Sequence, residues 1–97
     1  ETFGPVAAIL GFSDEDAVIR AANDTQYGLV AYVFTRDVSR ACRVSDALEY
    51  GMVAVNTVKL TGPPVPFGGV KQSGLGREGS RHGIDEYLEQ KYICLGL

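Results

Sequence analysis

Few side chains in this 97-residue sequence could do chemistry. Cys42 and Cys94 are the two thiols, and His82 is the single imidazole. A reactive thiolate needs an electropositive, partly exposed setting with a base in reach. Cys42 falls on the apolar stripe of a predicted helix and Cys94 falls in an apolar run, so we expect both to be packing residues and His82 to lie at a helix end or on the surface. With no Cys/His spacing typical of a metal site, we predict neither a catalytic residue nor a bound metal.

The glycine-rich stretch 66–79 contains a second chemical signal. Five of its fourteen residues are glycine, and Gly74 to Gly79 match the pattern GxGxxG. The dinucleotide fingerprint needs a strand directly before the glycines and a helix that opens within them. Here a loop rich in proline and glycine precedes them, so we favour a close-packed turn over a phosphate cradle.

Glu1 and Phe3 form a third candidate. A carboxylate can accept two hydrogen bonds from the vicinal diol of a nucleotide ribose. An aromatic ring two residues later could lie against a flat heterocycle. The alternative is a solvated Glu1 and a core Phe3, and on spacing alone we favour this alternative.

Composition limits the classes of protein. The chain is long enough for one domain at most, with 45% hydrophobic and 22% charged residues. A net charge of −3 argues against nucleic acid as a partner, and no apolar run is long enough to span a membrane. Two distant cysteines favour a reducing compartment, the cytoplasm or alternatively the mitochondrial matrix. Because the sequence begins at Glu1 and not at Met, we expect it to be part of a longer protein.

Periodicity predicts an α/β fold of the order β-α-β-α-β. Continuous apolar runs predict strands buried on both faces, and 3.6-residue spacing predicts the helices between them. The expected elements are a strand at 6–12, a helix at 14–23, a strand at 29–34, a helix at 38–48 and a strand at 52–55. Connections of this length imply parallel strands with right-handed crossovers.

Capping residues refine the two predicted helices. Ser13 is the expected N-cap of the first helix and Asp37 that of the second. Gly51 stands where a C′ glycine would end the second helix. The inner face of that helix is predicted to carry Val38, Ala41, Cys42, Ser45 and Leu48.

The rest of the chain is predicted to be less regular. Three prolines make 57–66 an irregular segment, and the glycine-rich loop follows it. Ile84, Tyr87 and Leu88 have the spacing of a short third helix. Residues 91–97 are expected to form a terminal strand.

Four motifs in the same order resemble the C-terminal portion of NAD(P)-dependent aldehyde dehydrogenases. They are residues 1–6 (ETFGPV), 23–29 (NDTQYGL), 55–56 (VN) and 66–79 (PFGGVKQSGLGREG). The resemblance covers the whole chain. Its ending, 77–88 followed by 91–96, is most similar to the succinate-semialdehyde dehydrogenase branch.

The resemblance implies roles for particular residues. It makes Glu1 the carboxylate that holds the nicotinamide ribose and Phe3 the ring beside the nicotinamide of NAD or NADP. It makes Phe67 an aromatic wall of the substrate channel. The loop before Phe67 lacks the serine of the semialdehyde branch, so Thr61 becomes the candidate hydroxyl donor and Lys59 a candidate charge.

The resemblance also implies an organisation and a reaction. Residues 1–89 would be the C-terminal part of the catalytic domain and 90–97 a terminal strand that joins subunits of a homo-oligomer. In the family a cysteine thiolate attacks the aldehyde, hydride passes to NAD(P)+, and a glutamate-activated water releases the acid. The nucleophile and the base precede this segment in such enzymes. The isolated chain is therefore expected to be inactive and to associate through exposed apolar edges.

Two other functional classes remain open at this stage. The chain could be a non-enzymatic module that pairs with a full-length dehydrogenase through its terminal strand. An upstream reading frame that continues into a cysteine-bearing segment would favour the enzyme. A stand-alone dinucleotide binder that uses Gly74 to Gly79 would require NAD+ binding by calorimetry, and we expect none.

Overall fold

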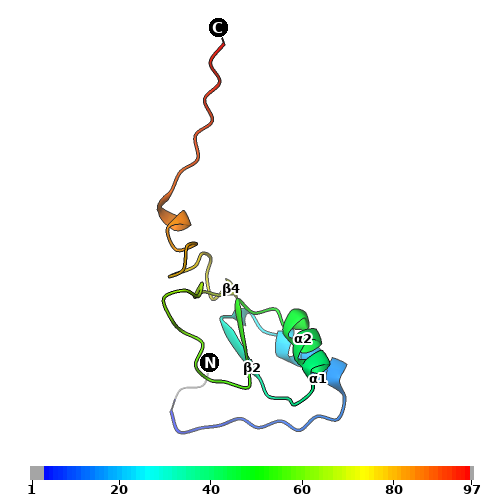
Figure 1. Ribbon diagram of the computed structural model, residues 1–97. Helices are drawn as coiled ribbons and strands as arrows, with labels where there is room; N and C mark the ends of the chain where they lie inside the picture. The colour runs from blue at the N-terminus through cyan, green and yellow to red at the C-terminus, as the bar shows by residue number, and fades with distance from the viewer. Residues whose placement is uncertain (1–3, 97) are drawn as a thin grey trace.

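The computed structural model describes residues 4–96, which form a small body and a long tail (Figure 1). Two helices and the paired strands make the body, and the last residues rise away from it. The elements in chain order are α1 (Glu15–Asn23), β1 (Tyr27–Gly28), β2 (Val30–Val33), α2 (Val38–Ala47), β3 (Met52–Val55), β4 (Val70–Lys71) and the short 3-10 helix η1 (Asp85–Tyr87). The tail gives the chain an elongated outline of 67 × 34 × 25 Å.

Both α-helices begin at an aspartate. The Asp14 carboxylate accepts a hydrogen bond from the backbone N–H of Ala17 at 2.6 Å. The predicted cap, Ser13, is wrong by one residue, because Asp14 has the extended backbone of an N-cap (φ −123°, ψ 123°) directly before α1. Asp37 caps α2 as predicted and accepts from the N–H of Arg40 at 3.1 Å.

The predicted parallel strand pair is confirmed. β2 and β3 pair in parallel from Val30↔Met52 to Val33↔Val55, with α2 as the connection. Ala54 on β3 is 5% exposed and is the one buried apolar side chain of the described residues. Both helices lie on the same side of this two-stranded sheet (Figure 1).

A second, antiparallel pair was not predicted. β1 pairs with β4 through Tyr27↔Lys71 and Gly28↔Val70, which brings the glycine-rich loop against the turn after α1. The sequence predicted a turn at 27–28 and a loop at 70–71. Strands of two residues carry too little periodicity to be recognised in a sequence.

Gly51 has a different role from the predicted one. α2 ends at Ala47 with Leu48 as its cap, so Gly51 is not the C′ residue. A Cβ at Gly51 would collide with the carbonyl oxygen of Gly68 and lie 2.7 Å from the Cα of Gly69. Glycine is required here because two backbones touch.

Neither predicted flanking strand forms within the described residues. Residues 6–12 and 91–96 run as extended chain without a strand partner. A strand is stable only with a hydrogen-bonded neighbour, and these apolar runs have none here. Ile9 and Leu10 are each 89% exposed as a result.

The remaining local predictions are met in part. The third helix is a single 3-10 turn, and Tyr87 on it is exposed. The half-buried residues of α2 and its C-cap are Ala41, Val44, Ser45 and Leu48. The predicted inner face was therefore right for Ala41, Ser45 and Leu48 and wrong for Val38 and Cys42. Val38 is exposed on the same helix.

Both cysteines are exposed in this chain, so their predicted packing roles are wrong here. Cys42 lies on the uncovered side of α2 and Cys94 lies in the tail. The apolar neighbours of Cys94, Ile93 and Leu95, are 77% and 81% exposed.

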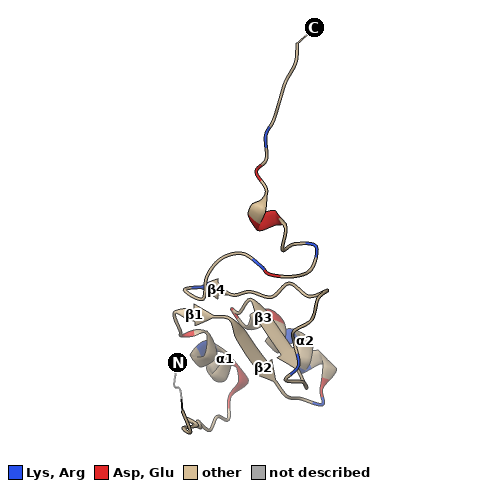
Figure 2. Ribbon diagram, turned by 90° about the vertical axis from the view of Figure 1, so that its left-hand side faces the viewer, with Lys and Arg blue, Asp and Glu red and all other residues tan. Residues whose placement is uncertain are grey.

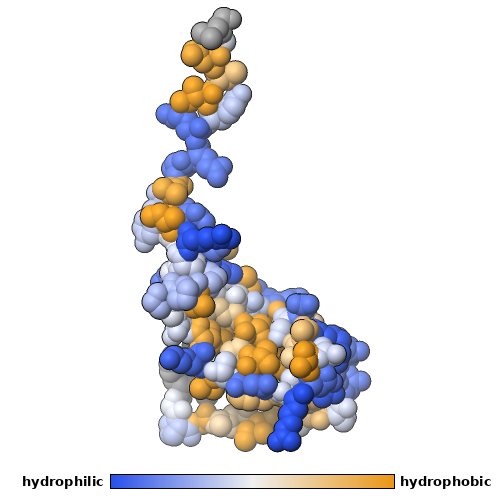
Figure 3. Space-filling model, viewed as in Figure 1, coloured by the Kyte–Doolittle hydropathy of each residue, from blue (hydrophilic) through white to orange (hydrophobic). Residues whose placement is uncertain are grey.

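Surface properties agree with this arrangement. Apolar residues appear on the body and again along the tail (Figure 3), and acidic and basic residues are interspersed (Figure 2). In the described part of the chain, no helix is both long and apolar enough to cross a membrane. Residues 4–96 contain no group of three His, Cys, Asp or Glu side chains that could hold a metal ion.

Candidate functional site

An open cleft of about 540 Å³ lies between the glycine-rich loop and η1. Phe67, Arg77 and neighbouring glycines form one wall. Ile84, Glu86 and Tyr87 form the other. The cleft thus combines an aromatic and aliphatic surface with one cation, Arg77, and two carboxylates, Glu78 and Glu86, a composition suited to a small polar molecule.

Phe67, one of the predicted substrate residues, lines this cleft. Its N–H donates to the carbonyl of Glu78 at 2.9 Å, and the N–H of Glu78 donates to the carbonyl of Phe67 at 2.7 Å. This reciprocal pair of backbone hydrogen bonds joins the two ends of the glycine-rich loop. The backbone of Phe67 is therefore held by two hydrogen bonds where its half-buried side chain lines the cleft.

Arg77 stabilises the same loop through its side chain, a role that was not predicted from the sequence. Its Nη1 donates to the carbonyl oxygen of Gly69 at 2.7 Å and to that of Gly76 at 2.6 Å. A half-buried guanidinium that satisfies two carbonyls stabilises a loop with few side chains of its own. The only sequence signal was an arginine inside a glycine-rich segment.

Lys71 anchors the base of the loop. Its ammonium Nζ lies 2.8 Å from the carbonyl oxygen of Asn23 and 2.8 Å from Oε2 of Glu49. Ser73 adds a second anchor, because its Oγ accepts from the N–H of Gly28 at 3.0 Å. Neither contact was predicted, since the partners lie more than twenty residues away in the sequence.

Thr61 is not brought into the cleft. It is exposed in the irregular segment before Phe67, and it is not one of the residues that line the cleft. Lys59, the candidate charge, lies in the same segment, where its N–H donates to Oγ1 of Thr57 at 3.1 Å. Glu1 and Phe3 lie outside the described residues.

The GxGxxG segment forms turns, as favoured from the sequence. Gly74 has φ +111° and Gly79 has φ +67°, backbone angles that suit glycine. Turns and bends follow the segment up to η1. The helix N-terminus on which a dinucleotide phosphate would rest is therefore missing from this part of the described chain.

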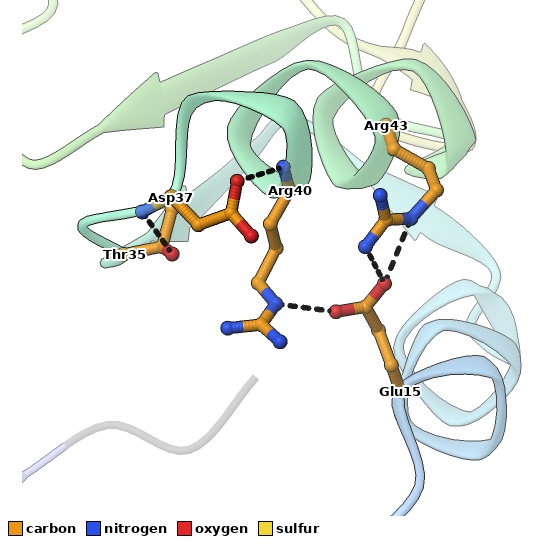
Figure 4. Close-up of polar contacts among 5 residues, drawn as sticks. All are labelled: Glu15, Thr35, Asp37, Arg40 and Arg43. Atoms are coloured by element: carbon orange, nitrogen blue, oxygen red, sulfur yellow. Dashed lines mark hydrogen bonds and ion pairs between the residues drawn. The ribbon is translucent and has the colours of Figure 1, made fainter.

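The other polar clusters of the described chain are structural. Oε2 of Glu15 lies 2.6 Å from Nε of Arg40, and its Oε1 lies 2.6 Å from Nη2 of Arg43 (Figure 4). These contacts join α1 to α2. His82 is exposed, as predicted, with Nδ1 3.5 Å from Oδ2 of Asp85.

Electrostatics of the Glu15 cluster follow from these contacts. Hydrogen bonds from Arg43 and then Arg40 lower the pKa of Glu15 below its ordinary value. The same carboxylate raises the pKa of Arg43. The backbone N–H of Arg40 lowers the pKa of Asp37, the α2 cap.

Comparison with known proteins identifies the family. The profile of the aldehyde dehydrogenase family matches residues 1–93. The chain therefore belongs to the aldehyde dehydrogenase family.

Particular relatives are similar over almost the whole chain. It is 68% identical over 96 residues to a non-phosphorylating aspartate-semialdehyde dehydrogenase of Halomonas elongata, covering 99% of this chain and 20% of that protein. It is 58% identical over 97 residues to the NADP+ succinate-semialdehyde dehydrogenase of Escherichia coli, covering 100% of this chain and 20% of that protein.

A solved structure supports the fold. An aldehyde dehydrogenase from Bacillus cereus, determined as an NAD+ complex, superposes with a TM-score of 0.86 at 41% identity. The match covers 90% of this chain and 18% of that one. The chain thus spans about a fifth of the length of the relatives it matches, which include proteins named for NADP+ and for NAD+.

Proposed function

We propose that this chain is the C-terminal segment of an oxidoreductase that oxidises a short semialdehyde to the carboxylic acid with NAD+ or NADP+. The observation that carries the proposal is that Phe67 lines an open cleft, on a loop closed by the Phe67–Glu78 bridge and by Arg77. Family membership supplies the reaction class.

The preferred substrate is succinate semialdehyde or a related semialdehyde. The two relatives compared above are named for aspartate semialdehyde and succinate semialdehyde. Each of these compounds carries a carboxylate at the end opposite the aldehyde. A site for such a molecule needs an apolar wall, which Phe67 would provide, and a donor to the carboxylate, for which Thr61 and Lys59 are our candidates.

Cofactor contacts are assigned to the start of the chain. Glu1 would accept the ribose hydroxyls and Phe3 would lie beside the nicotinamide. The nucleophile would come from another segment, because neither Cys42 nor Cys94 is among the residues that line the cleft. The isolated chain is then expected to have no dehydrogenase activity.

Assembly and location belong to the same proposal. The terminal strand, residues 90–97, would pair with a neighbouring subunit of a homo-oligomer, following the catalytic-domain part at 1–89. The apolar and exposed Ile93 and Leu95 support a role in contact with another chain. We assign the protein to the cytoplasm, with the mitochondrial matrix as the alternative.

A segment exchange tests the enzyme proposal. Residues 1–97 replace the matching segment of the Escherichia coli succinate-semialdehyde dehydrogenase, and formation of NADPH is followed with succinate semialdehyde. We expect the hybrid enzyme to be active and the isolated 97-residue chain to be inactive. In the hybrid, Phe67→Ala should raise the KM for the aldehyde by about tenfold, since truncating a buried aromatic contact removes more than 1 kcal/mol of binding.

Controls make the result decisive. The unaltered Escherichia coli enzyme sets the reference, and the KM for NADP+ should stay within about twofold in Phe67→Ala because no cofactor contact changes. A correctly folded but inactive hybrid would contradict the proposal. Turnover by the isolated chain would contradict the assignment of the nucleophile to another segment.

A non-enzymatic interaction module is the second candidate, and the exposed apolar tail favours it. Tyr92 is 88% exposed at the end of the chain, where an extended segment could add to a sheet edge of a full-length dehydrogenase. Sequencing the coding region upstream of Glu1 separates the two. A start codon at or near Glu1 would support the module, and a continuous frame into a cysteine-bearing segment would support the enzyme segment.

A further inference from the structure

We propose that Lys71 is a positioning residue that fixes the glycine-rich loop, and through it Phe67, relative to the helix–sheet body. The inference rests on the proposed role of Phe67 at the aldehyde. It assigns a function to a lysine that makes no contact with the cleft itself.

The backbone at Lys71 is the first observation. Its φ is +55°, in the left-handed region that glycine usually occupies. A residue with a Cβ is unfavourable in this region. Residues other than glycine adopt it where contacts with the surrounding structure hold them there. In a loop with many glycines, the presence of a strained lysine indicates that its side chain is needed at this position.

The side chain provides the second observation. Only 24% of it is exposed, and its Nζ donates to the carbonyl of Asn23 at 2.8 Å and pairs with Oε2 of Glu49 at 2.8 Å. Asn23 is the last residue of α1, at a helix end that carries a partial negative charge, and its carbonyl also accepts from the N–H of Thr25 at 2.8 Å. The ammonium therefore meets a helix terminus and a carboxylate together.

Asn23 connects this contact to the rest of the body. Its Nδ2 donates to the carbonyl of Ala47 at 2.8 Å, and its Oδ1 accepts from the N–H of Glu49 at 2.9 Å. The end of α1 and the turn from α2 to β3 are thus one rigid junction. Lys71 attaches the loop to that junction at a single point.

Other attachments of the loop are short. β1 and β4 pair over two residues each, and the N–H of Gln72 donates to the carbonyl of Gln26 at 2.9 Å. Oγ of Ser73 accepts from the N–H of Gly28 at 3.0 Å, and the backbones of Gly51 and Gly68 lie in contact. Two-residue strands are weak on their own. Since Phe67 precedes Lys71 by four positions, movement at Lys71 would be transmitted to the aromatic ring.

The test uses the hybrid enzyme with Lys71→Met, which removes the charge and keeps the length. We expect the KM for succinate semialdehyde to rise roughly five- to twentyfold, as loss of a charge-assisted hydrogen bond implies. The KM for NADP+ and kcat should stay within about twofold. Hydrogen–deuterium exchange should accelerate by about tenfold in peptides that cover 67–78 and stay unchanged over α2.

Variants at the same position separate the side chain from the backbone. Lys71→Gly removes the ammonium and suits the left-handed φ, so it should fold well and still show the raised aldehyde KM. Lys71→Arg retains a cation and should restore most of the loss. Arg20→Met, at an exposed arginine on α1, is the matched control and should leave every measurement unchanged.

Three outcomes would overturn the proposal. They are a loop exchange rate that Lys71→Met does not alter, a KM increase of equal size for both substrates, and wild-type behaviour of Lys71→Gly. If the unaltered hybrid is inactive, the proposed function fails. The exchange measurement on that same protein still tests the role of Lys71 in holding the loop.

Discussion

The helix–sheet body, residues 14–56, and the two flanking segments, 5–12 and 88–96, contain similarly apolar sequence but differ in structure. In the body, capped helices and the β2–β3 ladder satisfy the backbone. In the flanks, extended chain carries large apolar side chains into solvent, such as Leu10 at 89% and Leu95 at 81% exposed.

The difference lies in where the partners are. The two helices, β2 and β3 find their neighbours within about thirty residues, because α2 itself connects β2 to β3, as in other crossover units. The flanks have the composition of buried strands, yet the described residues offer them no strand neighbour. Local sequence is therefore sufficient for the body and insufficient for the flanks.

Gly51→Ala should change the free energy of unfolding most, since it disrupts the backbone contact between the body and the glycine-rich loop. The new methyl group would collide with the backbone of Gly68, so we expect the free energy of unfolding to fall by about 1–3 kcal/mol. Urea denaturation of the 97-residue chain measures it. Gly11→Ala, in a flank with open space around it, is the control and should cost far less.

If Gly51→Ala and Gly11→Ala destabilised the chain equally, the close approach of β3 and the glycine-rich loop would be contradicted. The distinction between body and flank would then lose its main support.

Association should depend on the flanks and not on the body. We expect the isolated chain to form dimers or larger species at micromolar concentration, because exposed apolar strands pair with other chains. The double change Ile9→Ser and Leu10→Ser should reduce the mass measured by light scattering and leave the free energy of unfolding within about 0.5 kcal/mol. A purely monomeric unmodified chain would contradict this expectation.

The smallest effect is expected at Glu15, within the body. Its pKa lies below the ordinary value of 4.5. Glu15 therefore contributes stability above that value and loses it as the pH falls through the lowered pKa. Glu15→Gln should destabilise the chain slightly at neutral pH and have no effect in acid, where the native carboxyl is protonated.

Urea midpoints at both pH values would measure the Glu15 effect, with Asp16→Asn on the same helical turn as the control. Asp16 makes no ion pair among residues 4–96. Equal pH dependence in the two variants would show that the ion pairs with Arg40 and Arg43 do not link the helices.

Much of the body could be predicted from sequence. Apolar runs gave β2 and β3, and the Asp37 cap gave the start of α2, because these signals act within a few residues. Phe67, which the family resemblance places at the substrate channel, lines the cleft, and its role toward the substrate stays a prediction. Thr61 was predicted with it, but the structure leaves Thr61 exposed outside the cleft.

The contacts that shape the site could not be predicted. Lys71, Asn23 and Glu49 meet only after two sheets and a helix are assembled. Gly51 was misinterpreted because a close approach and a helix C′ position both select glycine. In each case the decisive partner is distant in sequence, and a single sequence carries no signal of such a pairing.

The extended tail has a practical consequence for handling the chain in solution. The radius of gyration is 17.9 Å, whereas a compact domain of this length would have one of about 13 Å. A single chain should therefore diffuse slowly and elute early from a gel-filtration column calibrated with spherical standards. Its elution volume would resemble that of a larger protein, so stoichiometry should be assigned from absolute mass and not from elution.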